Sequence, residues 1–205
     1  MSLEERAFSF ESDGLRIEAM LHEGEGALAA VILHPHPLYG GDMDNHVVLA
    51  LRAALAEAGA TTLRFNFRGA GHSEGSFDDG RGEAEDARNS MSALRQLRPA
   101  AGLVLAGYSF GALVAAGISR EIELRALILV SPPVALGPLP ELPTGVPSLL
   151  ITGEFDDIAP ADRLASLEGP VTRVAVVPGT GHAWWPGVDA LALEVAAFLK
   201  GVPAP

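Results

Sequence analysis

One stretch carries most of the structural information in this chain: Leu103-Val-Leu-Ala-Gly-Tyr-Ser-Phe-Gly-Ala-Leu-Val-Ala-Ala116. An apolar run typical of a buried strand leads directly into Gly-x-Ser-x-Gly, and small residues typical of a helix follow. This layout is that of a nucleophile elbow, a sharp strand-to-helix turn that lifts a serine above the sheet. Glycines suit Gly107 and Gly111 because such a turn leaves little room for a Cβ. The pattern predicts a nucleophilic Ser109; the alternative is an ordinary glycine-rich turn.

The same pattern occurs a second time, at Gly71-His-Ser-Glu-Gly75. Here the preceding strand-like run, 61–67, ends several residues earlier, and residues 76–82 have the composition of a loop. An elbow needs strand, serine and helix in immediate succession. We therefore expect a loop at this place and no nucleophilic role for Ser73.

Strand-like and helix-like segments alternate from about residue 29 to the end of the chain, after an antiparallel pair of strands at 8–10 and 15–21. Such alternation predicts an α/β fold with a mostly parallel, eight-stranded sheet covered by helices on both faces. The 205 residues fit one domain over 1–205. Besides the elbow strand, later strands are expected at 29–33, 61–67, 126–130, 148–152 and 171–177. Helices are expected at 45–58, 83–97, after the elbow, near Pro160 and at 188–200.

The connection between the expected strands at 126–130 and 148–152 is short and rich in proline. Its prolines are Pro132, Pro133, Pro138, Pro140, Pro143 and Pro147. A run of this composition forms a stiff loop and is too short for a separate capping domain. The sequence therefore predicts an open site without a lid.

Bulk composition excludes several classes of function. The formal net charge of −12 argues against nucleic acid as a partner, because phosphates would be repelled. No apolar run reaches the ~18 residues of a membrane span, so no membrane association is expected. The chain has no cysteine, which excludes disulfides, thiolate metal sites and a cysteine nucleophile. Residues 1–6 lack the order of a secretory signal, so we expect a cytoplasmic protein; a homodimer is compatible with the sequence.

Two later loops supply the base and the acid that a serine nucleophile needs. Gly153-Glu-Phe-Asp-Asp-Ile-Ala-Pro160 follows one expected strand and presents two aspartates, and Pro178-Gly-Thr-Gly-His182 follows the next. The carboxyl ends of strands in such sheets are where catalytic groups gather. We therefore expect Ser109, Asp156 and His182 to form a catalytic triad, although each partner alone is more often a turn residue or a solvated side chain.

An oxyanion hole completes the expected chemistry. One donor should be the backbone N–H of Phe110, the residue after the nucleophile. The other should come from the loop 34–41, where the two prolines have no N–H, which leaves His36, Leu38 or a neighbour. His36 is the favoured donor. The His-x-His spacing of this loop also resembles half of a metal site, but no further ligand set follows, so no metal is expected.

Taken together, these segments resemble the α/β-hydrolase fold serine hydrolases. More narrowly, the chain is similar to the small, lidless bacterial group related to dienelactone hydrolases and X-Pro dipeptidyl-peptidase-like hydrolases. The likeness rests on residues 34–41, 64–75, 107–111, 153–160 and 179–182. The family spacing of glycine, aspartate and proline selects Asp156 over Asp157. A serine stands where dienelactone hydrolases have cysteine, which argues against lactone chemistry.

The resemblance implies a carboxylesterase-like enzyme without a cofactor, acting on a small-molecule ester through an acyl-enzyme. A peptidase or amidase, or a thioesterase, would use the same triad, and a non-catalytic ligand-binding protein on this fold is the alternative from another class. Four aromatic side chains are candidates for shaping the pocket or for simple packing: Tyr39, Tyr108, Trp184 and Trp185. An open site favours small or exposed acyl groups over long-chain lipids.

Overall fold

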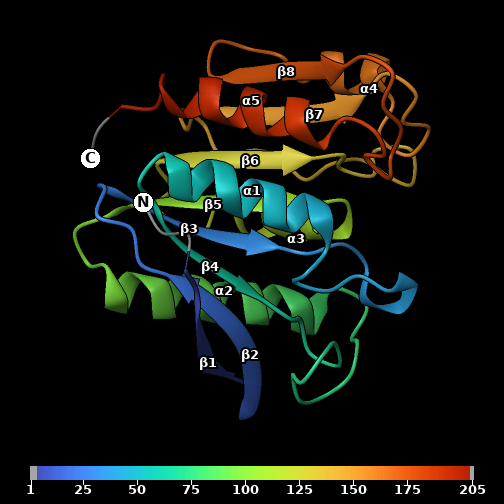
Figure 1. The fold of residues 1–205 in the computed structure, drawn as a ribbon. Helices are drawn as coiled ribbons and strands as arrows, with labels where there is room; N and C mark the ends of the chain where they lie inside the picture. Colours follow the sequence, from blue (N-terminus) through green and yellow to red (C-terminus); the bar gives the residue numbers. More distant parts are fainter. Residues whose placement is uncertain (1–3, 204–205) are drawn as a thin grey trace.

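A single eight-stranded sheet runs through the protein, seen in a computed structural model that describes residues 4–203 (Figure 1). Its spatial order is β1-β2-β4-β3-β5-β6-β7-β8, with β1 and β2 antiparallel and the other six strands mutually parallel. The strands are β1 (Arg6–Ser12), β2 (Leu15–His22), β3 (Leu28–Leu33), β4 (Thr61–Phe65), β5 (Gly102–Tyr108), β6 (Ala126–Val130), β7 (Ser148–Gly153) and β8 (Thr172–Val177). The predicted α/β class and mostly parallel sheet are confirmed.

Helices cover both faces of this sheet. On one face α1 packs beside α5, and on the other α2 lies next to α3 (Figure 1). The helices are α1 (His46–Glu57), α2 (Arg81–Leu97), α3 (Phe110–Ile118), the short α4 (Ala161–Ala165) and α5 (Val188–Leu199), with one 3₁₀ turn, η1 (Pro37–Tyr39). Every residue of β4, β5, β6 and β7 is buried, as expected for strands covered on two sides.

The expected elements agree with the structure to within a few residues at their ends. The antiparallel strands are longer than expected, because cross-strand pairing extends from Arg6 opposite Leu21 to Ser12 opposite Leu15. The turn η1 was not expected; a proline at its first position and a capping side chain of His36 nucleate it. Within residues 4–203, every helix is too short or too polar to span a lipid bilayer.

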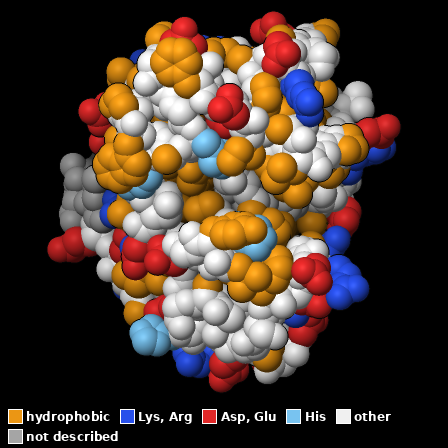
Figure 2. All heavy atoms as spheres, turned by 90° about the vertical axis from the view of Figure 1, so that its right-hand side faces the viewer, with side chains coloured by type: hydrophobic (Ala, Val, Ile, Leu, Met, Phe, Trp, Pro, Cys, Tyr) orange, Lys and Arg blue, Asp and Glu red, His pale blue; other side chains and the backbone are white. Residues whose placement is uncertain are grey.

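The proline-rich connection 131–147 contains no helix or strand. It therefore adds no cap over the sheet. Figure 2 shows the face at the carboxyl ends of the parallel strands, where hydrophobic side chains gather around an open hollow. The loops that follow β3, β5, β7 and β8 meet there.

Candidate active site

The turn between β5 and α3 holds Ser109 in a conformation that few residues adopt. Its backbone angles are φ 53° and ψ −115°, a strained combination for a residue with a side chain. The two flanking glycines permit the turn: a Cβ on Gly107 would lie 2.3 Å from the carbonyl oxygen of Gly111, and one on Gly111 would lie 2.4 Å from that of Leu33. The backbone N–H of Ser109 donates to Val130 at 2.8 Å, which fixes the turn against β6.

Ser109, His182 and Asp156 form a continuous hydrogen-bonded row. The Oγ of Ser109 lies 3.0 Å from Nε2 of His182, and Nδ1 of His182 lies 2.9 and 3.0 Å from the two carboxylate oxygens of Asp156. A carboxylate only accepts hydrogen bonds, so Nδ1 carries the proton and Nε2 is free to accept from the serine hydroxyl. Three loops far apart in sequence thus bring the predicted triad residues together.

The surroundings of Asp156 keep its carboxyl group ionised. Burial alone would raise its pKa, but hydrogen bonds from His182, Ser131 and the N–H of Ala159 outweigh that cost and hold the pKa below the usual value of an aspartate. The N–H groups of Ile158 and Ala159 donate to Oδ1 at 3.0 and 2.8 Å. The neighbouring Asp157 is exposed, so the structure places Asp156, not Asp157, beside the histidine.

The loop after β3 leaves one of its N–H groups unused. Among the described residues, none accepts from the N–H of His36 or of Phe110, and both residues line the same pocket as Ser109. The N–H of Leu38 instead donates to Nδ1 of His36 at 3.2 Å, and that of Tyr39 donates to the carbonyl of His36 at 3.1 Å. Of the donors considered from sequence, His36 is therefore the one that remains available.

His34 anchors this loop from beneath. Its Nδ1 lies 2.6 Å from the carbonyl of Pro35, and its Nε2 accepts the N–H of Phe67 at 3.0 Å. Burial lowers the pKa of His34 to about 4, so the imidazole is neutral at pH 7 and serves as one donor and one acceptor. Both nitrogens are thus occupied, and within residues 4–203 no group of three or more potential ligands is placed to hold a metal.

Comparison of the sequence with known proteins shows the family to which the chain belongs. Residues 40–153, more than half of the chain, match the family described as serine aminopeptidase, S33. The chain belongs to this family. A protein of Rickettsia prowazekii described as uncharacterized is 39% identical over 149 aligned residues, with 67% of this chain and 60% of that protein covered. This chain therefore spans only about 60% of the length of that relative.

Two solved structures extend the likeness to the whole fold of this S33 family member. A Xanthomonas campestris protein, described as an α/β serine hydrolase without lid, has a TM-score of 0.89 at 29% identity, with 100% of this chain and 98% of that one covered. A serine hydrolase homologue from Coxiella burnetii has a TM-score of 0.84 at 30% identity, covering 97% and 98%. The chain thus has the fold of the lidless α/β serine hydrolases. A narrower relation to dienelactone hydrolases stays a prediction.

The segment that carries His182 is held against the rest of the fold by three consecutive residues. The hydroxyl of Tyr108 donates to the carbonyl of His182 at 2.7 Å, Nε2 of His46 lies 2.9 Å from the carbonyl of Ala183, and the indole N–H of Trp184 donates to Ser131 at 3.0 Å. These contacts reach β5, α1 and the residue after β6. They hold the imidazole in place without using its nitrogens.

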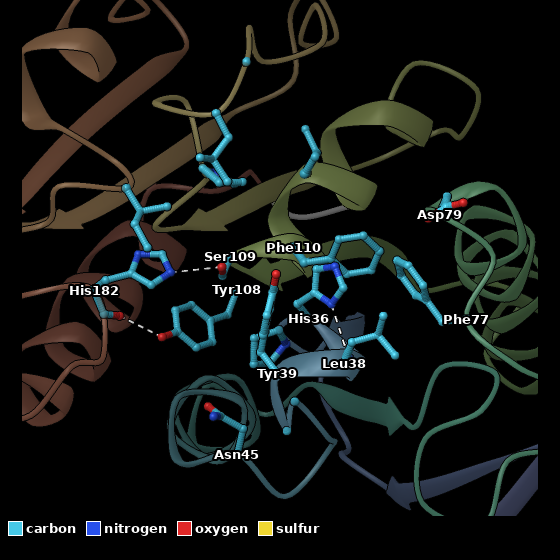
Figure 3. A pocket seen from close by; sticks show the side chains of 18 of the residues that line it. His36, Leu38, Tyr39, Asn45, Phe77, Asp79, Tyr108, Ser109, Phe110 and His182 are labelled. Atoms are coloured by element: carbon cyan, nitrogen blue, oxygen red, sulfur yellow. Dashed lines mark hydrogen bonds between the residues drawn. The ribbon is translucent and has the colours of Figure 1, made fainter.

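A pocket of about 840 Å³ opens beside Ser109 and His182 (Figure 3). Its lining is mostly apolar, and Asp79 is its one acidic residue; none of the described residues that line it is Lys or Arg. Of the four aromatic candidates, Tyr39 and Tyr108 line this pocket. Trp184 is fully buried and Trp185 is stacked on His46, and neither belongs to the lining.

Sequence reasoning missed several residues of this site. Ser131 comes directly after the carboxyl end of a buried strand. A position of this kind also pointed to Asp156, but a serine is too common there to be singled out. Phe77 and Asp79 lie in the loop after the second Gly-x-Ser-x-Gly pattern, and no local pattern links that loop to Ser109. The second pattern, 71–75, lies in a loop as predicted, and the hydroxyl of Ser73 donates to the carbonyl of Asn66 at 2.6 Å.

Proposed function

We propose that the protein is a carboxylesterase-like serine hydrolase that cleaves small esters through an acyl-enzyme on Ser109. The observation that carries the proposal is the hydrogen-bonded row from Ser109 through His182 to Asp156, at 3.0 and 2.9 Å. A strained serine at a helix N-terminus, a histidine within reach and an orienting carboxylate are the parts that activate a serine for acyl transfer. A non-catalytic binding protein would need none of them.

In the first half of the proposed reaction, Oγ of Ser109 attacks the ester carbonyl carbon while its proton passes to Nε2 of His182. The carbonyl oxygen becomes an oxyanion that accepts from the N–H groups of His36 and Phe110, each donor being worth roughly 10²–10³ in rate. The tetrahedral intermediate collapses, the bond to the leaving alcohol breaks, and His182 returns the proton to the alcohol oxygen. Asp156 stabilises the imidazolium without taking its proton.

In the second half, a water molecule attacks the acyl-enzyme. His182 accepts the water proton, the bond between Oγ and the acyl carbon breaks, and the proton returns to Ser109 as the acid leaves. The open connection 131–147 leaves the pocket accessible to water and to small substrates. Every proton transfer uses one atom, Nε2 of His182, which lies 3.0 Å from the nucleophile.

Amide cleavage is the second candidate, because the family that the chain matches is described by aminopeptidase activity. The same residues would act, and the leaving group would be an amine. A thioesterase acting on a phosphorylated carrier is less well supported, since no Lys or Arg is among the described residues that line the pocket. Matched ester, amide and thioester substrates with one acyl group distinguish the three.

The deciding experiment is labelling of the purified protein with a fluorophosphonate, with the modified residue mapped by mass spectrometry. Ser109→Ala is the test variant and Ser73→Ala the matched control, since Ser73 sits in the other Gly-x-Ser-x-Gly pattern. We expect stoichiometric labelling of Ser109 that is unchanged in Ser73→Ala and absent in Ser109→Ala. Absence of labelling in the wild type, or labelling that survives Ser109→Ala, would overturn the proposal and favour the binding protein.

A further inference from the structure

The pocket has two sides relative to the nucleophile. In Figure 3, His182 lies on one side of Ser109, and Phe110, His36 and Phe77 lie on the other, with Asp79 beyond them. His182 must deliver a proton to the leaving group, so in the proposed function the leaving group faces His182. The acyl substituent then points the other way, along Phe110 and Phe77.

The acyl side is a connected wall of rings. The imidazole of His36 stands at its centre, with its centroid 4.8 Å from those of Tyr39, Phe77 and Phe110. Phe77 and Phe110 are themselves 5.8 Å apart. Tyr39 is 88% exposed, so much of its surface has no partner within the protein. Rings at such spacings offer edges and faces to a further aromatic ring.

The rings of this wall carry no charge, whereas the far end of the pocket has an acidic side chain. Burial lowers the pKa of His36, so its imidazole is neutral at pH 7. Asp79 lines the end of the pocket, and the carboxylates of Asp79 and Glu83 act on His36 through their charge. With no Lys or Arg among the described lining residues, nothing there compensates an anionic substrate. The pocket volume of about 840 Å³ is also much larger than an acetyl group requires.

We propose that the preferred acyl group is an uncharged arylalkanoyl group whose ring lies against His36, Tyr39, Phe77 and Phe110. This inference rests on the proposed function and specifies its substrate class. An aryl ring on a short chain fits an open pocket and gains ring contacts that acetyl or butyryl groups cannot make. An acyl group ending in a carboxylate would instead face Asp79.

The test compares 4-nitrophenyl esters that share a leaving group and differ only in the acyl part: acetate, butyrate, 3-phenylpropionate and hydrogen glutarate. We expect kcat/KM for the phenylpropionate to exceed that for acetate and butyrate by about 10- to 100-fold. The glutarate ester should be the slowest of the longer esters, and Asp79→Asn should raise its rate selectively.

Phe77→Ala is the test variant and Phe155→Ala the matched control. Phe155 is 65% exposed on the same face but does not line the pocket. The ratio of kcat/KM for phenylpropionate over acetate should fall at least tenfold in Phe77→Ala and stay unchanged in Phe155→Ala. If Phe77→Ala does not fold, as judged by thermal unfolding, Phe77→Leu removes the ring at similar volume and should show the same loss.

The outcomes separate this inference from the proposed function. Hydrolysis that depends on Ser109 but is as fast for acetate or butyrate as for phenylpropionate would overturn the inference and leave the function standing. A phenylpropionate preference that survives loss of the Phe77 ring would also overturn it. If no ester is cleaved in a manner that depends on Ser109, the proposed function itself fails.

Discussion

The indole N–H of Trp184 donates to the hydroxyl of Ser131 at 3.0 Å, and both side chains are fully buried. Ser131 stands directly after β6 with φ 47°, and its hydroxyl also forms a hydrogen bond to Asp156 that lowers the pKa of that carboxyl. The segment that carries the histidine and the loop that carries the acid are therefore joined through a third loop. In the proposed reaction Ser131 is a positioning residue, because it acts only through Asp156.

We expect Ser131→Ala to reduce kcat/KM by about tenfold, because one buried hydrogen bond to the carboxylate is lost and the Trp184 N–H is left unpaired. The pKa of Asp156 should rise, so the pH below which activity is lost should move upward. Ser148→Ala is the control. Ser148, the first residue of β7, is equally buried, and its hydroxyl donates to the backbone carbonyl of Val146. If the activity of Ser131→Ala were lost at the same acidic pH as that of the wild type, the pH–rate profiles would contradict the positioning role.

Asp156 and Asp157 offer a second matched pair. Asp156→Asn should lower kcat by about 10⁴-fold with little loss of folding stability, because the amide favours the wrong histidine tautomer. Asp157→Asn should leave kcat within about threefold, since Asp157 is exposed. Steady-state kinetics on a 4-nitrophenyl ester checks both. Equal losses in the two variants would show that the general charge of the loop matters and not the bond to His182.

Two glycines of α3 test the geometry of the elbow. Gly111→Ala should destabilise the protein by roughly 2–4 kcal/mol and abolish labelling of Ser109, because the new Cβ would collide with the backbone of Leu33 and His34. Gly117→Ala, in the same helix, meets no atom within 4 Å and should stabilise by about 0.5–1 kcal/mol. Denaturant unfolding gives both values. A tolerated alanine at 111 would mean that the elbow is not closely packed against β3.

His34 should make folding stability depend on pH. Its pKa is about 4 in the folded protein and about 6.5 in the unfolded chain, so the unfolded chain binds the proton first as pH falls. This contribution to stability is complete above about pH 6.5 and is lost progressively between pH 6.5 and 4, amounting to about 3 kcal/mol. His34→Gln keeps a donor and an acceptor without titrating, so its free energy of unfolding should fall less between pH 7 and 5.

The exposed His72 supplies the control for that measurement, because His72→Gln also removes one imidazole. Denaturant unfolding of wild type and both variants at the two pH values gives the comparison. We expect the reduced pH dependence in His34→Gln only. The same reduction in His72→Gln would show that the number of imidazoles matters and not the burial of His34.

Much of the fold and part of the site follow from the sequence alone. The sheet was predictable because buried strands and amphipathic helices alternate, and the elbow because its constraints lie within five consecutive residues, 107–111. The loops of His182 and Asp156 were predictable for a related reason: in a parallel sheet the residues after each strand end at the same edge. These are consequences of local sequence and of one topological rule.

Tertiary structure decided what depends on contacts between distant segments. Only the folded loop leaves the N–H of His36 free and uses that of Leu38, because the choice rests on how the 3₁₀ turn closes. Only the packed sheet brings Ser131 and Trp184 together, 53 residues apart in sequence, and places Phe77 beside Phe110. A short segment encodes its own backbone conformation, but a hydrogen bond or ring contact between segments exists only once packing has set their separation.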